Sequence, residues 1–168
     1  MNLKLTLDDV MPDNEATVYG IVSELPDYRL CFMLNKELNL ALQLSPHPKI
    51  LYRKKISYAF NDYVYLQEQE KMEWHLTANR KSLEVNISES FNNQGKPERT
   101  YQYSQEFLPL SLVNDLKAFD YFLWFDDLSR KGIEKKINQS LKGASYVRTF
   151  QKIDLSHSKF IDNLFIEL

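Results

Sequence analysis

The chain has 168 residues, of which 43% are hydrophobic, 13% aromatic and 26% charged, and its formal net charge at pH 7 is -2. This composition predicts a single folded domain over residues 1–168 and excludes an intrinsically disordered chain or a collagen-like repeat. No apolar run reaches the ~20 residues of a membrane-spanning helix, and residues 1–15 lack the apolar core of a signal peptide. Cys31 is the only cysteine, which excludes an internal disulfide. We therefore expect a soluble cytoplasmic protein.

The first 22 residues contain two segments with the pattern of β-strands. Leu3, Leu5 and Leu7 alternate with polar residues, which is typical of a strand with one buried face. The segment 17–22 is rich in β-branched and aromatic residues and predicts a second strand. Acidic residues and a proline separate the two segments, so we expect an N-terminal hairpin.

A helix is predicted directly after these strands. Pro26 and Asp27 favour its start, because proline is tolerated in a first turn and an acidic side chain there complements the helix dipole. Asn39 is a suitable residue for its end. Three leucines at four-residue spacing predict the buried stripe: Leu30, Leu34 and Leu38.

Residues 50–79 predict one long hairpin. Apolar and polar residues alternate from residue 56 to 65 on one arm and from 74 to 78 on the other. The polar stretch 67–71 between the arms is expected to form the turn.

A second hairpin is predicted from the alternating segments 83–87 and 101–103. Residues 92–95, Asn-Asn-Gln-Gly, have the composition of a turn. Without this hairpin the segment would be an unusually long loop.

The most apolar run lies at residues 119–125 and predicts a central strand buried on both faces. Asp126 and Asp127 end the run and are expected to cap a helix over residues 128–142, which is followed by a strand over 145–153. The apolar stripe of that helix has four-residue spacing: Ile133, Ile137 and Leu141.

Together these elements predict an α+β fold, with a mostly antiparallel sheet of about six strands and two main amphipathic helices packed on one face. The apolar residues 164–166 near the C-terminus are expected to dock on the domain.

The sequence contains none of the common catalytic motifs: G-x-S-x-G, the P-loop and G-x-G-x-x-G are all absent. His47, His75 and His157 lack partners at metal-ligand spacing, so we expect no metal site and no cofactor. Cys31 lies beside the apolar stripe of the first helix and is interpreted as a buried core residue rather than a nucleophile.

Asp120 is the most suggestive acidic residue, because it lies within an aromatic strand where an isolated charge is costly. One interpretation is a general base with a raised pKa in a pocket, which would make the protein an enzyme, with Tyr121 or Asn35 beside it. The favoured interpretation is a structural ion pair, for which Arg29 on the first helix is the natural candidate.

The C-terminal quarter is basic. Residues 128–168 carry eight Lys and Arg against four Asp and Glu, whereas residues 1–127 carry 13 against 19. Lysines and arginines with interleaved aromatics favour RNA or single-stranded nucleic acid as an alternative ligand. The cationic residues of this candidate interface are Arg130, Lys131, Lys135, Lys136, Lys142 and Arg148.

The order of several short motifs resembles the IPExxxVDY family of small bacterial proteins. The segment Val113–Tyr121 occupies the position of the naming motif, in which Asp120 and Tyr121 stand unchanged. The other matching segments are Gly20–Ser23, Asp27–Leu30, Leu34–Lys36, Ala78–Asn79, Lys81–Ser82, Ile153–Asp154 and Asn163–Leu164. The resemblance implies a cytoplasmic protein without an established activity, and it supplies no catalytic residues.

The favoured function is therefore non-catalytic protein–protein interaction. The chain contains ten tyrosines and ten phenylalanines, more than one hydrophobic core of this size is expected to bury. Tyrosine is enriched at protein interfaces. The partner is expected to be another protein, with a homodimer as the simplest version. Candidate binding residues are Arg29, Asn35, Asp120 and Tyr121.

Overall fold

A computed structural model of the chain describes residues 16–53, 56–68, 71–81, 86–91, 97–102, 110–126, 132–159 and 161–165. For residues 56, 81, 86–91 and 97–102 it describes the backbone alone. The predicted strand at residues 3–7 lies outside the described residues, as does residue 166 of the predicted docking tail.

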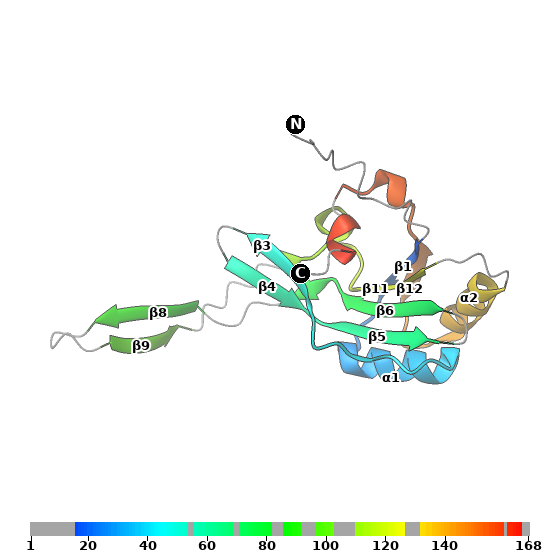
Figure 1. The fold of residues 1–168 in the computed structure, drawn as a ribbon, viewed down its shortest axis with the longest axis horizontal. Helices are drawn as coiled ribbons and strands as arrows, with labels where there is room; N and C mark the ends of the chain where they lie inside the picture. The colour runs from blue at the N-terminus through cyan, green and yellow to red at the C-terminus, as the bar shows by residue number, and fades with distance from the viewer. Residues whose placement is uncertain are drawn as a thin grey trace, which may run out of the picture.

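A six-stranded antiparallel sheet forms the centre of the fold, with strand order β12-β1-β11-β6-β5-β2 (Figure 1). Its strands are β1 (Ala16–Val22), β2 (Gln43–Leu44), β5 (Asp62–Gln67), β6 (Met72–Ala78), β11 (Tyr121–Asp126) and β12 (Thr149–Lys152). The predicted α+β class and the antiparallel sheet are thus confirmed. In the sheet β1 lies between β11 and β12, strands from the far end of the chain.

Three further strand pairs accompany the sheet. They are β3 (Lys49–Arg53) with β4 (Ile56–Phe60), β7 (Arg80–Lys81) with β10 (Leu110–Ser111), and β8 (Asn86–Phe91) with β9 (Pro97–Gln102). The β8–β9 pair confirms the predicted second hairpin, and its turn lies outside the described residues.

The predicted hairpin over residues 50–79 is correct around its turn at 67–71, where β5 pairs with β6, and wrong in extending one arm back through β4. The chain turns at Asn61, so that β4 pairs with β3 whereas β5 pairs with β6. The sequence contains only a partial signal: Tyr58 and Phe60 stand at even positions and Tyr63 and Tyr65 at odd ones, but residues 63–66 are all apolar or aromatic. A regular strand through Asn61 would place the aromatic residues before and after it on opposite faces.

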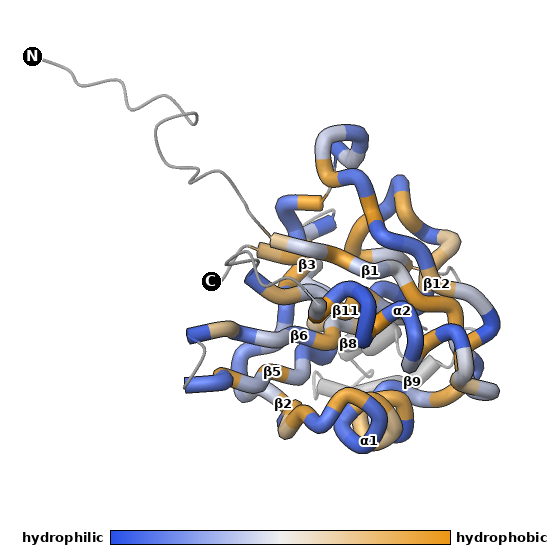
Figure 2. The backbone as a smooth tube through the Cα atoms, turned by 90° about the vertical axis from the view of Figure 1, so that its right-hand side faces the viewer, coloured by the Kyte–Doolittle hydropathy of each residue, from blue (hydrophilic) through white to orange (hydrophobic). Residues whose placement is uncertain are grey.

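Both helices cover one face of the sheet. They are α1 (Asp27–Leu38) and α2 (Ile133–Gly143), and their buried side chains join the inward residues of the sheet in the first hydrophobic core. The tube of α1 carries both hydrophobic and hydrophilic stretches, as expected of an amphipathic helix (Figure 2). The helix-side core includes Leu30, Cys31, Leu34, Leu38, Ile137 and Leu141.

The start of α2 differs from the prediction. Gly132 occupies the N-cap position with φ of 114°, a backbone conformation that favours glycine, and Asp126 is the last residue of β11. The predicted cap at Asp126 is therefore wrong, and Asp127 lies outside the described residues. The strand predicted over 145–153 is also shorter, because a turn at residues 144–147 precedes β12.

A second hydrophobic core lies on the opposite face of the sheet. It joins Phe122 and Trp124 of β11 to Phe60 and to Leu164. Three short 3-10 helices, η2 (Asn114–Leu116), η3 (Leu155–His157) and η4 (Ile161–Leu164), flank this core. Four consecutive β11 side chains are almost fully buried, so the predicted central strand has two buried faces. Within the described parts of the chain, neither α1 nor α2 is long and apolar enough to span a membrane.

Candidate functional site

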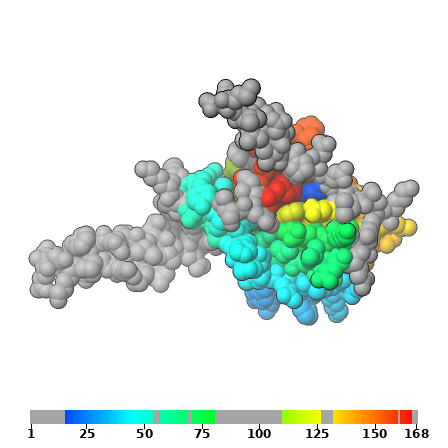
Figure 3. All heavy atoms as spheres, viewed as in Figure 1, coloured from blue at the N-terminus to red at the C-terminus, as the bar shows by residue number. Residues whose placement is uncertain are grey.

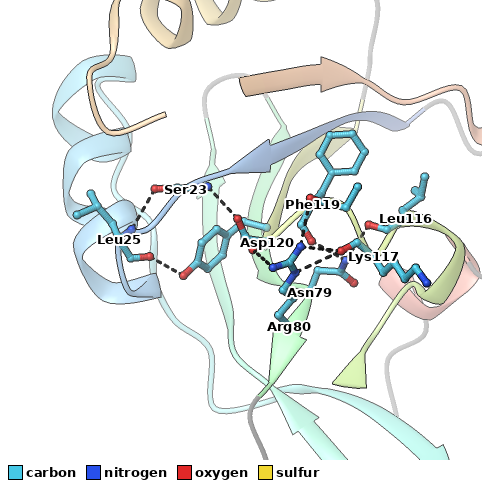
Figure 4. A network of polar contacts seen from close by, with 10 residues as sticks. Ser23, Leu25, Asn79, Arg80, Leu116, Lys117, Phe119 and Asp120 are labelled. Atoms are coloured by element: carbon cyan, nitrogen blue, oxygen red, sulfur yellow. Dashed lines mark hydrogen bonds and ion pairs between the residues drawn. The ribbon is translucent and has the colours of Figure 1, made fainter. Parts of the chain in front are cut away.

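Asp120 lies immediately before β11 and ties three parts of the chain together (Figure 4). Its Oδ1 lies 3.0 Å from Arg80 Nη1, and its Oδ2 accepts a 3.0 Å hydrogen bond from the backbone N–H of Ser23. Its own N–H donates to the carbonyl of Ile21 at 2.9 Å. Both carboxylate oxygens therefore have donors, as expected of a structural ion pair.

The predicted partner of Asp120, Arg29, is wrong. Arg29 is exposed on the outer side of α1, whereas Arg80 follows β6, the neighbour of β11 in the sheet. Arg80 also donates from Nε and Nη2 to the carbonyl of Lys117, at 3.2 and 2.9 Å. One guanidinium thus holds both Asp120 and the backbone that leads into it.

Asn79 fixes the same loop from inside (Figure 4). Its amide donates to the carbonyls of Leu116 and Phe119, at 3.1 and 2.9 Å, and its Oδ1 accepts from the N–H of Val113 at 2.8 Å. The side chain is fully buried. Two segments that carry the family resemblance, around residue 79 and over 113–121, are therefore in direct contact.

Tyr121 is a half-buried anchor. Its hydroxyl donates to the carbonyl of Leu25 at 2.7 Å, in the loop that precedes α1. Burial, and then the nearby carboxylates of Asp27 and Asp120, raises the pKa of Tyr121 to about 12. The phenol keeps its proton near neutral pH and positions the loop.

Asn35 holds a different part of the fold. Its side-chain amide donates to the carbonyl of Leu42 at 3.0 Å, and its Oδ1 accepts from the N–H of Leu42 at 2.9 Å. It thus fixes the return of the chain after α1. Of the four predicted binding residues, the structure brings Asp120 and Tyr121 together and leaves Arg29 and Asn35 apart from them.

Sequence reasoning missed a buried polar network between the sheet and β3. Asp62 Oδ2 is hydrogen-bonded to His75 Nδ1 at 2.9 Å, and Asp62 Oδ1 accepts from Thr77 at 2.6 Å. Lys49 Nζ lies 3.8 Å from Asp62 Oδ2, and Trp124 Nε1 donates to Thr77 Oγ1 at 3.0 Å. All five side chains belong to residues that are at most 5% exposed.

A cavity of about 650 Å³ borders this network and is lined by residues 43–47 together with Asp62, Val64 and Glu73. His75 Nε2 lies 3.6 Å from Glu73 Oε1. The carboxylate of Asp62 is engaged by three neighbours, which indicates a stabilising role for the network. The pattern that could have revealed it is the register of β5 and β6, which places Asp62 opposite Thr77.

The predicted basic interface is partly engaged within the protein. Lys136 donates to the carbonyl of Leu38 at 2.7 Å, and Arg148 forms an ion pair with Glu24. Lys135 and Lys142 are exposed, whereas Arg130 and Lys131 lie outside the described residues.

The outer face of α1 carries a distinct surface, which we name the outer α1 stripe: Tyr28, Arg29, Phe32 and Lys36. Tyr28 is 59% exposed and Phe32 is 67% exposed. Tyr28, Phe32 and Lys36 follow one another at four-residue spacing and form one strip on the helix, and Arg29 lies beside it, three positions before Phe32. Within the described chain no ion pair engages Arg29 or Lys36.

Comparisons of the sequence with models of protein families, with curated proteins and with solved structures found no match. The resemblance to the IPExxxVDY family therefore stays a prediction.

Proposed function

We propose that the protein is a non-catalytic binding module that recognises a protein partner through the outer α1 stripe. The observation that carries this proposal is the exposed aromatic pair Tyr28 and Phe32, which has two exposed cations, Arg29 and Lys36, beside it. Aromatic residues and arginine are enriched in protein interfaces and dominate their binding energy. The helix lies along the lower margin of the molecule, where neighbouring elements leave its outer side open (Figure 3).

The charges of the stripe indicate the chemistry of the partner. Arg29 and Lys36 are the charged members of this face, whereas Glu37 lies on the flank beside Tyr146 and Asp27 is hydrogen-bonded to Asn61. A partner that inserts an apolar side chain between the aromatics and places carboxylates over the cations would complement this face. We therefore infer an acidic partner surface with an apolar centre.

The two alternative functions have weaker support. Nucleic-acid binding through Lys136 and Arg148 would compete with bonds that these side chains already make. Catalysis by Asp120 would require a carboxylate oxygen to leave Arg80 or the N–H of Ser23.

Affinity capture with paired baits tests the proposal. The full-length chain, a Tyr28→Ser/Phe32→Ser variant and a Tyr52→Ser control would each be immobilised and exposed to a lysate of the source organism. Tyr52 is 65% exposed on β3, so its substitution removes a comparable aromatic surface elsewhere. We expect a partner that the wild type and the Tyr52 control retain and the double variant loses.

The purified partner would then be titrated calorimetrically at low and high salt. We expect Phe32→Ser to weaken binding by about tenfold or more and Arg29→Gln/Lys36→Gln to reduce the salt dependence. If the captured protein is a second copy of this chain, the stripe is a homodimer interface and the inference of an acidic partner is wrong. If every retained protein also binds the double variant, the proposal is wrong.

A further inference from the structure

The spacing of the residues in the outer α1 stripe indicates what kind of element its partner presents. Arg29 and Lys36 are both exposed and lie seven positions apart, which is about 20° short of two helical turns and about 10.5 Å along the axis. Phe32 lies three positions after Arg29 and four before Lys36. Along the axis the stripe therefore presents an exposed aromatic ring between two positive charges.

A partner helix matches this spacing because it has the same repeat. Two side chains seven residues apart on a helix lie about 10.5 Å apart on one face, so two carboxylates at that spacing can face Arg29 and Lys36 together. On one face of a strand the available spacings are about 6.7 Å and about 13 Å, which displace one carboxylate by roughly 3 Å or more. The charges of the stripe therefore favour a helical partner over an extended one.

The aromatic residues of the stripe lead to the same conclusion. Tyr28, Phe32 and Lys36 form a ridge of side chains four residues apart. In the commonest packing of two helices, such a ridge lies in the groove between two similar ridges of the other helix, and the axes cross at about −50°. Tyr28 and Phe32 are 59% and 67% exposed, so a groove lined by apolar side chains would remove a large apolar area from water.

The second helix offers a comparison within the same molecule. Lys135 and Lys142 of α2 are also exposed and seven positions apart. The positions between them on that face are occupied by Asn138 and Gln139, which are polar. The α2 helix therefore has the charge spacing of the stripe without its apolar centre, and it separates a specific contact from simple attraction between charges.

From this spacing we propose that the partner binds the outer α1 stripe through an acidic amphipathic helix, in which two acidic residues seven positions apart flank an apolar pair. The two carboxylates of that helix pair with Arg29 and Lys36. Its apolar pair packs on the rings of Tyr28 and Phe32. This inference rests on the proposed function, because it names the element that the protein partner presents to the same surface.

Designed peptides test the inference without the natural partner. The probe is an alanine-based peptide with two glutamates seven positions apart and two adjacent leucines midway between them. A lactam bridge on its opposite face holds it helical, because short helices are marginal in water. A second bridged peptide has the same composition but its glutamates are five positions apart, so they no longer share a face. A third peptide lacks the bridge and contains a central proline, which breaks the helix.

Titrations of the isotope-labelled protein at low salt, followed by nuclear magnetic resonance, locate and measure the binding. We expect the probe to shift the backbone amide resonances of residues 28–36 saturably, with a Kd below about 1 mM, and to leave α2 unshifted. The second and third peptides are expected to bind at least about tenfold more weakly.

Variants of the protein provide matched controls, and all the substituted side chains are exposed. Phe32→Ser and Arg29→Gln/Lys36→Gln are each expected to weaken binding of the probe by about tenfold or more. Lys135→Gln/Lys142→Gln removes two charges at the same spacing from α2 and is expected to change it less than about twofold. The thermal unfolding of each variant shows whether it is folded.

Three results would overturn the inference: no saturable shift on α1 with the probe up to about 5 mM, equal affinities for the three peptides, or equal shifts on α1 and α2. Failure of the proposed function is a different result, namely captured proteins that bind the Tyr28→Ser/Phe32→Ser variant as well as the wild type. If capture depends on the stripe and the three peptides bind equally, the proposed function stands and the helical partner is wrong.

Discussion

The imidazole of His75 lies parallel to the indole of Trp124, with ring centroids 3.7 Å apart and planes inclined by 4°. The two residues occupy paired positions on β6 and β11, on the face opposite the helices. The imidazole is hydrogen-bonded to Asp62 and the indole N–H to Thr77. This stack therefore joins the buried polar network to the second hydrophobic core.

Removal of the central carboxylate is expected to be strongly destabilising. Asp62→Ala would leave Lys49 and His75 buried without their shared anion, and we expect the free energy of unfolding to fall by about 3–5 kcal/mol. Urea denaturation followed by circular dichroism measures the change. Asp126→Ala, at the exposed end of β11, is the matched control and is expected to change stability by less than about 0.5 kcal/mol. Equal stabilities of the two variants would contradict a stabilising network.

The ion pair of Asp120 predicts different effects for two arginines. Arg80→Ala would remove the partner of Asp120 and the donors to the carbonyl of Lys117, so we expect a loss of about 1–3 kcal/mol. Arg29→Ala alters an exposed side chain and is expected to change stability by less than about 0.5 kcal/mol. Thermal and urea unfolding compare the two. If Arg29→Ala lost more stability than Arg80→Ala, the result would favour Arg29 as the partner of Asp120, as predicted from the sequence.

Local patterns in the sequence predicted most of the elements. The four-residue spacing of leucines located α1, and the aromatic run located β11, because both signals depend on which side chains the element buries. The pairing of β1 with β11 and β12 was not predictable, because strands more than 90 residues apart carry no local signal of their partner. The break at Asn61 was only weakly marked, because residues 63–66 are all apolar or aromatic, and alternation alone does not say which strand each half will join.

The candidate site shows the same limit. The expectation that Asp120 has a structural partner followed from the cost of a buried charge, which is a local property. The identity of that partner depends on strand order, which places Arg80 beside Asp120 and points Arg29 into solvent. Likewise, the contact of Asp62 with His75 requires the β5–β6 register, and composition alone does not contain that information.

Gly20 is expected to tolerate no side chain. A Cβ atom at this position of β1 would lie 2.5 Å from the ring of Phe119, well inside van der Waals contact. Because the ring packs with Phe122 in the second core, we expect Gly20→Ala to cost about 1–3 kcal/mol. Combining it with Phe119→Ala removes the clash, so the loss in the double variant should be smaller than the sum of the two single losses. Additive losses in urea unfolding would argue against this contact.

Tyr121 predicts how stability changes in alkali. Its pKa is raised from 10.0 to about 12 by burial and by the carboxylates of Asp27 and Asp120, so the folded state holds the phenolic proton more tightly than the unfolded chain. This contribution to stability is complete below pH 10 and is lost as the pH rises from 10 to about 12. We expect the free energy of unfolding to fall over this range, and Tyr121→Phe to make the fall less steep. Chemical unfolding between about pH 9 and pH 11 compares the slopes, and absorbance near the tyrosinate band identifies the ionising group. If the stability of Tyr121→Phe fell as steeply with pH as that of the wild type, the loss would come from other ionising groups. The hydrogen bond from Tyr121 to Leu25 would then not hold the phenolic proton.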